Sequence, residues 1–257
     1  MSNVQGSLAA EERLQWLTEQ LAVAGFVAIS AASTKLDVSE MTIRRDLVEL
    51  EGRGTARRVR GGAKAVGPLT FDERRDTATR AKSRIARKLA GLVPATGAVA
   101  FDASSTVMRV ASLLQSAAAA PRDLMILTNG PETFQALQGV SGVTAVLTGG
   151  RLDSRTGSLV GPLACRAAAQ LTVQTFFTSA AAVDPTGGAF EMALEEAEVK
   201  RTIAAGADEV VLAVDGSKLA GRALAVAVEW DHVDLLVTDL DPGDERLAPY
   251  RGLAELL

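Results

Sequence analysis

The sequence has little of what several protein classes require. A single cysteine, Cys165, excludes an intramolecular disulfide framework, and a single histidine, His232, leaves no His/Cys spacing typical of a metal site. No apolar run approaches the roughly 20 residues that a membrane helix needs. Residues 1–12 contain no basic residue and two glutamates, unlike a signal peptide. We therefore expect a cytoplasmic protein that has no membrane association, bound metal or cofactor.

Charge is distributed unevenly along the 257 residues, although the chain as a whole has a net charge of −4. Residues 38–64 contain seven of the lysines and arginines, and no acidic residue lies between Arg53 and Lys64. Composition offers one explanation, because 21 of the 27 basic residues are arginine and pairs such as Arg44-Arg45 arise by chance on solvated helix faces. A binding site for a polyanion is the other explanation, and the surrounding pattern decides between them.

Three short helices are predicted before residue 53. Leu14, Leu17 and Leu21 recur at helical spacing, and residues 26–29 are β-prone. Ser30 is expected to cap a second helix over residues 31–36, and Ser39 a third.

In the third helix, the expected buried stripe is Ile43, Leu47 and Leu50, which turns Thr42 and Arg45 outward. Residues 55–62 then predict a small hairpin that ends in two glycines. This pattern indicates a helix-turn-helix with a basic wing, and a helix of this kind fits the major groove of double-stranded DNA.

The stretch "VSEMTIRRDLVELEGRGTARRVRGGA" resembles the signature of the DeoR-type (GlpR-like) bacterial transcription regulators. The resemblance implies that Ser39, Thr42, Arg44 and Arg45 face DNA, and that Arg58, Arg60, Gly61 and Gly62 form a wing against the backbone. We expect Arg57 to contact phosphate together with Arg58 and Arg60.

The rest of the chain shows a different pattern. Residues 67–82 are interpreted as a linker and connecting helix, following a DNA-binding domain over residues 1–66. From residue 83 to 257, helical runs alternate with the apolar runs "AVAF", "LMILT", "TAVLT", "TFFTSA", "EVVLAV" and "VDLLVT", which predicts a parallel α/β domain. Cys165 is expected to be a small core residue and His232 a strand-edge residue.

Polar and glycine residues follow four of these strands. Because the carboxyl ends of parallel strands meet at one edge of the sheet, they are candidates for an anion site. For each motif alone, helix capping or turn formation is the simpler explanation, and Lys200 alone suits a solvated helix face. The candidate residues are Asp102, Ser104, Ser105, Thr106, Asn129, Gly149, Gly150, Lys200, Asp215 and Lys218.

The resemblance to DeoR-type regulators extends over this half, in D-A-S-S-T, T-N, G-G, E-A-E-V-K-R and D-G-S-K. It implies a sensor domain that resembles the sugar-phosphate isomerase fold, with a phosphorylated sugar as effector. Ser104 and Ala182 replace glycines of the family pattern, and Gln174 replaces a common aspartate, which predicts a narrowed or reshaped pocket.

The expected function is therefore a repressor that binds a DNA operator as a homo-oligomer, a dimer or a tetramer, and is not an enzyme. Two alternatives remain open. The second half would be only an oligomerisation scaffold, or it would be an isomerase-like enzyme with Glu195 or Asp102 as its base.

Overall fold

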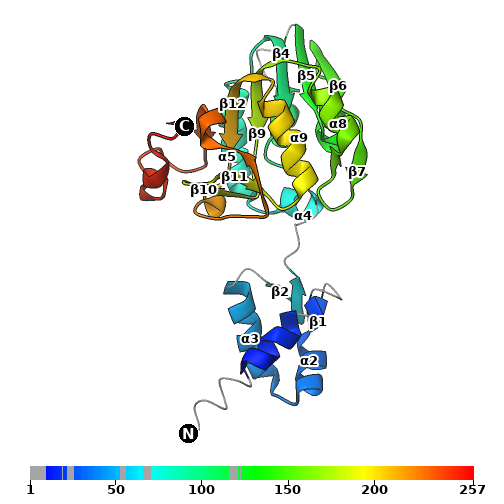
Figure 1. Cartoon of the computed structure of the whole chain (residues 1–257), viewed down its shortest axis with the longest axis vertical. Helices are drawn as coiled ribbons and strands as arrows, with labels where there is room; N and C mark the ends of the chain where they lie inside the picture. Colours follow the sequence, from blue (N-terminus) through cyan, green and yellow to red (C-terminus); the bar gives the residue numbers. More distant parts are fainter. Residues whose placement is uncertain are drawn as a thin grey trace. The chain divides into compact units, whose positions relative to one another are not determined.

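The computed structural model describes residues 10–18, 20–21, 26–52, 56–65, 71–115, 121 and 123–257. The chain divides into two compact units, Met1–Pro68 and Leu69–Leu257 (Figure 1). Among the described residues, no helix is both long and apolar enough to span a lipid bilayer.

The first unit combines helices with a three-stranded antiparallel sheet in the order β1-β3-β2. An N-terminal helix, described over residues 10–18 and 20–21, is followed by β1 (Phe26–Ala28), α2 (Ile29–Leu36), α3 (Glu40–Gly52), β2 (Ala56–Val59) and β3 (Gly62–Ala65). The predicted stripe of Ile43, Leu47 and Leu50 is buried in its core. The helix-turn-helix with a hairpin wing is thus confirmed.

The two predicted helix caps differ in outcome. Ser39 caps α3 as expected, since its Oγ accepts a hydrogen bond from the Thr42 amide at 3.1 Å. The prediction for Ser30 is wrong, because α2 begins at Ile29 and no side chain caps it. The Ile29 amide instead donates to the Gly61 carbonyl at 2.9 Å, so the hairpin turn satisfies the start of α2.

A seven-stranded parallel sheet forms the centre of the second unit, in the order β15-β14-β12-β9-β4-β5-β6. All six apolar runs of the sequence are strands here, and the short β15 is an addition. The strands are β4 (Thr96–Phe101), β5 (Asp123–Thr128), β6 (Val143–Leu147), β9 (Val173–Thr178), β12 (Ala207–Ala213), β14 (Leu235–Val237) and β15 (Glu255–Leu256).

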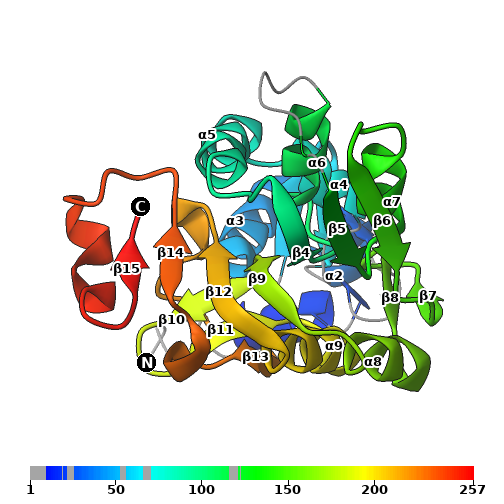
Figure 2. The ribbon, with the colours of Figure 1, turned by 90° about the horizontal axis from the view of Figure 1, so that it is seen from above.

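Helices cover both faces of this sheet (Figure 2). One face carries α5 (Thr79–Ala90), α6 (Met108–Leu114) and α7 (Pro131–Leu137), and the other carries α8 (Pro162–Ala168) and α9 (Leu194–Ala204). Each layer has its own apolar core, one around Ile85 and Phe101 and one around Phe176 and Ile203. Half-buried Cys165 packs on the second core, as expected.

The remaining elements are short, and apart from α4 (Phe71–Asp76), which lies in the segment predicted to hold a linker and connecting helix, they were not predicted. They are α4, the hairpin β7 (Arg151–Asp153) and β8 (Ser158–Val160), and the strands β10 (Ala182–Asp184), β11 (Gly188–Glu191) and β13 (Ala225–Val228). Three 3-10 helices complete the described elements, at Gly216–Lys218, Trp230–His232 and Glu245–Tyr250. His232 is exposed in the second of these and lies outside the strands, contrary to expectation.

The segment expected to be a linker and connecting helix belongs to the second unit from Leu69 onward. Phe71 at the start of α4 is buried, and Arg74 donates a hydrogen bond to the Thr156 carbonyl between β7 and β8. Phe71 and Arg74 therefore pack against the rest of the second unit.

The chain order places a topological switch point in the large sheet. From β4 the chain proceeds to β5 and β6 on one side, and then returns to β9 and β12 on the other side. In open α/β sheets, ligands bind at the carboxyl ends of the strands at such a point. Asp102 directly follows β4, and Ser179 directly follows β9.

Candidate nucleic-acid interface and anion site

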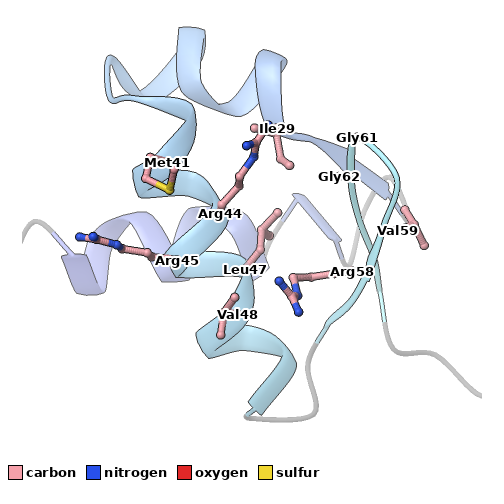
Figure 3. A pocket seen from close by; sticks show the side chains of 10 residues that line it. All are labelled: Ile29, Met41, Arg44, Arg45, Leu47, Val48, Arg58, Val59, Gly61 and Gly62. Atoms are coloured by element: carbon pink, nitrogen blue, oxygen red, sulfur yellow. The ribbon is translucent and has the colours of Figure 1, made fainter.

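A groove on the first unit lies between α3, the start of α2 and the β2–β3 hairpin (Figure 3). It is lined by Ile29, Met41, Arg44, Arg45, Leu47, Val48, Arg58, Val59, Gly61 and Gly62. Arginine from both α3 and the hairpin meets here, so the groove combines a helix surface with positive charge. The sequence predicted this combination.

The arginines of this surface differ in their partners. Arg44 pairs with Glu40 one turn earlier at 3.2 Å, and both side chains are half-exposed. Arg58 pairs with Glu51 at 2.7 Å, and hydrogen bonds from the backbone and side chain of Arg58 lower the pKa of Glu51. Within the described residues, Arg45 and Arg60 make neither a hydrogen bond nor an ion pair. Their charges are thus available to a polyanion without breaking an existing contact.

Ser39 and Thr42 stand at the start of α3, where their hydroxyl oxygens lie 2.9 Å apart. Arg57 is half-buried in β2, and Arg60 is exposed at the hairpin turn. Gly61 is exposed at that turn with a φ of +86°, whereas Gly62 is buried. A side chain at Gly62 would collide with the Val27 carbonyl of β1, which indicates that this glycine allows the close approach of β1 and β3.

One buried pair of this unit was missed by the sequence reasoning. Asp46 is 6% exposed on α3 and pairs with Arg13 of the N-terminal helix at 2.8 Å. The two residues lie on different helices, so no helical spacing relates them. The pair fixes the N-terminal helix against the inner side of α3.

In the second unit, Asp102 lies at the centre of a buried polar network. It is 0% exposed and accepts hydrogen bonds from the Ser179 amide at 2.8 Å and the Thr178 hydroxyl at 2.9 Å. Lys200 from α9 pairs with it at 2.9 Å and also with Glu191. Burial raises the pKa of Asp102, but the Lys200 charge and the hydrogen bonds outweigh burial and lower it.

Lys200 is 2% exposed, so its interpretation as a solvated helix charge is wrong. Burial alone would lower its pKa, but the carboxylates of Asp102 and Glu191 raise it above the ordinary value. Lys200 therefore remains charged, and two carboxylates already neutralise it. This arrangement holds Asp102 in place beneath the strand ends and leaves Lys200 little capacity for a further anion.

A third buried carboxylate, Glu196, adjoins the network of Asp102, Glu191 and Lys200. Ser158 of β8 donates a hydrogen bond to it, and burial raises its pKa. Glu195, the base suggested for an isomerase-like enzyme, instead points to Arg151 and is half-exposed. The neighbouring Glu196, and not Glu195, lies on the buried face of α9.

Four cations gather beside the strand ends, namely Arg74, Lys82, Arg109 and Lys218. The sequence predicted Lys218 as a site residue and did not predict the other three. Lys82 of α5 donates to the Ser105 hydroxyl at 3.1 Å and to the Arg74 carbonyl. Burial and the nearby charges of Lys218, Arg109 and Arg74 together lower the pKa of Lys82 to about 8, although Asp215 acts in the opposite direction.

None of these four cations forms a salt bridge within the described residues; they donate to carbonyl and hydroxyl groups instead. Lys218 donates to the Ala180 carbonyl, and Arg109 of α6 donates to the Arg75 carbonyl at 2.8 Å. Burial also lowers the pKa of Lys218. The Nε atoms of Arg74 and Arg109 are buried and have no hydrogen-bond partner in the part of the chain that the structure describes. Unpaired cations held this closely favour the binding of an anion.

Arg74, Lys82, Arg109 and Lys218 are called the cation cluster below. The other predicted residues follow the strands β4, β5, β6 and β12. The Ser104 hydroxyl accepts from the Val107 amide at 3.1 Å, and Asp215 accepts from the Ser217 amide. Thr106 is buried, and the Oδ1 of buried Asn129 has no partner. Gly149 and Gly150, at the end of β6, have φ values of +70° and +117°.

The three departures from the family pattern leave the backbone unstrained. Ser104 and Ala182 are absent from the residues with positive φ, so neither position requires glycine. Gln174 lies at the start of β9 beside Gly97, at the opposite edge of the sheet from Asp102. In the described chain, no three His, Cys, Asp or Glu side chains are grouped as a metal site would require.

Comparison with known proteins assigns both units. Residues 13–68 match the family model of the DeoR-like helix-turn-helix domain, and residues 77–240 match that of the DeoR C terminal sensor domain. The transcriptional repressor AccR of Agrobacterium fabrum is 30% identical over 238 residues, covering 90% of each chain.

Two further relatives align over nearly the whole length. The glycerol-3-phosphate regulon repressor of Escherichia coli is 29% identical, covering 90% of this chain and 91% of its own. The HTH-type transcriptional regulator GlpR of Haloferax volcanii is 32% identical, covering 89% of each chain. Among solved structures, a ribose 5-phosphate isomerase from Methanocaldococcus jannaschii aligns at 13% identity, with a TM-score of 0.37 over 53% of this chain and 52% of its own.

Proposed function

This chain belongs to the DeoR family of helix-turn-helix transcriptional regulators, and we propose that it represses genes of sugar metabolism under the control of a phosphorylated sugar. The first unit binds a double-stranded DNA operator, and the second unit binds the effector. Relatives named as repressors, AccR and the glycerol-3-phosphate regulon repressor among them, support the assignment.

DNA binding by the first unit rests on the exposed face of α3 and the hairpin. Arg45 has no partner among the described residues and points away from the core, where its two nitrogen donors suit a guanine edge in the major groove. Arg60 at the hairpin turn suits a phosphate. Arg44 and Arg58 would exchange Glu40 and Glu51 for DNA, so binding through them includes the loss of an existing pair.

The observation that carries the effector assignment is the cluster of four cations without carboxylate partners at the strand ends. A phosphate monoester brings between one and two negative charges near neutral pH, which the cluster would neutralise. Ser105 is already hydrogen-bonded to Lys82 and would complete the anion's donors. Asp215 and the unpaired Oδ1 of Asn129 are available to sugar hydroxyls.

We also propose that the active form is a homo-oligomer, a dimer or a tetramer, located in the cytoplasm. A single winged helix contacts a short site, and a symmetric assembly doubles the contact over a repeated half-site.

A mobility-shift assay tests this function. The full chain is mixed with the region upstream of its own gene, and a panel of sugar phosphates is added, with the corresponding free sugars as controls. A shift that one sugar phosphate alters and its free sugar does not is the expected result. A shift that no compound alters would favour an oligomerisation scaffold, and conversion of a sugar phosphate would favour an isomerase-like enzyme.

A further inference from the structure

Two large apolar side chains are exposed on the outer face of α3. Met41 is 58% exposed and Val48 is 48% exposed, and neither belongs to the apolar core of the first unit. Counting along the helix, Met41, Arg45 and Val48 stand four and three residues apart, which is the spacing of one helix face. They form a stripe of apolar, cationic and apolar side chains on α3 (Figure 3). By helical spacing this stripe lies opposite the buried Ile43, Leu47 and Leu50.

The fold does not require these apolar groups. Valine is a weaker helix former than alanine or glutamate at an exposed position, and an exposed Met gains nothing from burial. A second copy of this chain would also cover an apolar stripe. However, two such faces would bring Arg45 of both copies together, and within the described residues Arg45 has no acidic partner, so this charge favours a polyanionic partner instead.

The dimensions of the stripe match a short run of base pairs. A helix rises about 1.5 Å per residue, so Met41 and Val48 lie ~10 Å apart along α3. Base pairs are spaced about 3.4 Å apart, so the stripe covers about three base-pair steps. The apolar group that DNA presents in its major groove is the C5 methyl of thymine, and arginine is the usual partner of guanine there.

We propose that Met41 and Val48 recognise thymine methyl groups on either side of a guanine contacted by Arg45. This inference rests on the proposed binding of DNA by the first unit, and it adds which bases the operator contains and which residues select them. Arg44, Arg58 and Arg60 add affinity, whereas the apolar pair adds sequence preference.

Replacing thymine by uracil provides the test, because it removes the methyl group and changes nothing else in the base pair. The full chain first selects its preferred duplexes from a randomised pool. Each thymine of the best duplex is then replaced by uracil in turn, and affinity is measured by fluorescence anisotropy. We expect uracil at two positions that flank a guanine to weaken binding by about fourfold each, as for the loss of one buried methylene-sized group.

Variants of Met41 and Val48 show which of the two residues contacts each thymine position of the duplex. Met41→Ala should bind thymine and uracil equally at one of the two positions and still discriminate at the other, and Val48→Ala should show the reverse. Leu163→Ala, which removes a side chain that is 61% exposed on α8, is the matched control and should keep both preferences. Circular dichroism establishes that each variant is folded.

The outcomes separate this inference from the function on which it rests. If no duplex is enriched, the proposed DNA binding fails. If a duplex is enriched but every uracil substitution leaves affinity unchanged, DNA binding stands and thymine recognition is overturned. A changed oligomeric state in Met41→Ala or Val48→Ala, with thymine preference intact, would assign the stripe to a second copy of the chain.

Discussion

Lys82 illustrates how one residue connects burial to ligand binding. Burial, followed by the charge of Lys218, lowers its pKa to about 8. We expect the affinity for the phosphorylated sugar to decrease as pH rises through this value, because Lys82 then loses the proton that neutralises the anion. Calorimetry between pH 7 and pH 9.5 measures this decrease. The phosphate is already mostly dianionic in this window, so its own titration contributes little.

Lys82→Arg is the control for this prediction, since arginine stays charged throughout and the affinity should then vary less with pH. Equal pH profiles in the two proteins would contradict the role of Lys82. The free energy of unfolding changes with pH in the opposite direction to the effector affinity. The folded protein releases the Lys82 proton at a lower pH than the unfolded chain does. The free energy of unfolding should therefore rise between about pH 8 and the ordinary lysine value of 10.5.

We expect Asp102 to contribute mainly to the stability of the fold, and less to ligand binding. Its carboxylate is fully buried and is one of the two carboxylates that pair with Lys200. Replacing it by asparagine leaves a buried lysine with a single carboxylate partner. We expect Asp102→Asn to lower the free energy of unfolding by about 3–5 kcal/mol, as breaking a buried ion pair does. Urea denaturation of the full chain measures this change.

Glu195→Gln is a matched control on α9, because it removes the acidic partner of an exposed pair with Arg151. Exposed pairs contribute little, so its effect should stay within about 0.5 kcal/mol. A similar loss in both variants would show that the network around Asp102 contributes no more than a surface pair.

At the scale of elements, the hairpin of the first unit depends on Gly62. A side chain there would collide with the Val27 carbonyl of β1, and backbone atoms cannot move aside cheaply. We expect Gly62→Ala to disrupt the β1–β3 pairing and to abolish operator binding. Gly61→Ala should cost only about 1–2 kcal/mol through its positive φ, since no atom lies near the added carbon.

Thermal unfolding and mobility shift distinguish these two variants, and effector affinity should be unchanged in both. If Gly62→Ala bound the operator as tightly as the unchanged chain, the close approach of β1 and β3 would not matter for binding.

The elements that sequence predicted are those set by local pattern. The strands β4, β5 and β12 are continuous apolar runs, and the cap of α3 by Ser39 involves residues three positions apart. The prediction of a cap by Ser30 was wrong because the Gly61 carbonyl accepts the hydrogen bond from the first amide of α2. This carbonyl is brought there by the folded hairpin, so the local sequence gives no sign of it. The short strands β10, β11 and β13 have no periodic signal long enough to detect.

The candidate site shows the same division. Asp102 and Lys218 follow strands, and the sequence placed both at the carboxyl edge. The burial of Lys200 depends on Asp102 and Glu191, which lie on other elements, so its sequence neighbours give no sign of it. Arg74 and Lys82 were missed because mixed charge after a glycine and a proline is typical of linkers. They lie on two separate helices, α4 and α5, so no helical spacing relates them.

At the scale of the whole molecule, the position of α4 in the chain connects the effector site to the DNA-binding unit. This helix begins at Phe71, a few residues after the boundary of the first unit at Pro68. Its carbonyls at Arg74 and Arg75 accept hydrogen bonds from Lys82 and Arg109, two of the cations that we assign to the anion. An anion bound by these cations therefore competes with their contacts to α4.

This competition predicts a measurable coupling between effector and operator. If the effector weakens operator binding tenfold, the operator must weaken effector binding by the same factor, which corresponds to about 1.4 kcal/mol. Calorimetry of the effector with free and operator-bound protein measures one side of this coupling, and mobility shift measures the other. Two unequal factors would mean that a third species, such as a change of oligomeric state, takes part in the equilibrium.

The variant Lys218→Ala distinguishes operator binding from effector binding. Lys218 is a cation of the cluster on the second unit, so the variant should bind the operator normally and lose at least tenfold in effector affinity, together with the effector response. Lys88→Ala is the matched control, because Lys88 donates only to the Thr238 and Leu240 carbonyls in the second unit. Retained effector affinity in Lys218→Ala would remove this lysine from the site. Lost operator binding would instead mean that the cluster stabilises the DNA-binding form without any effector, because Lys218 belongs to the second unit.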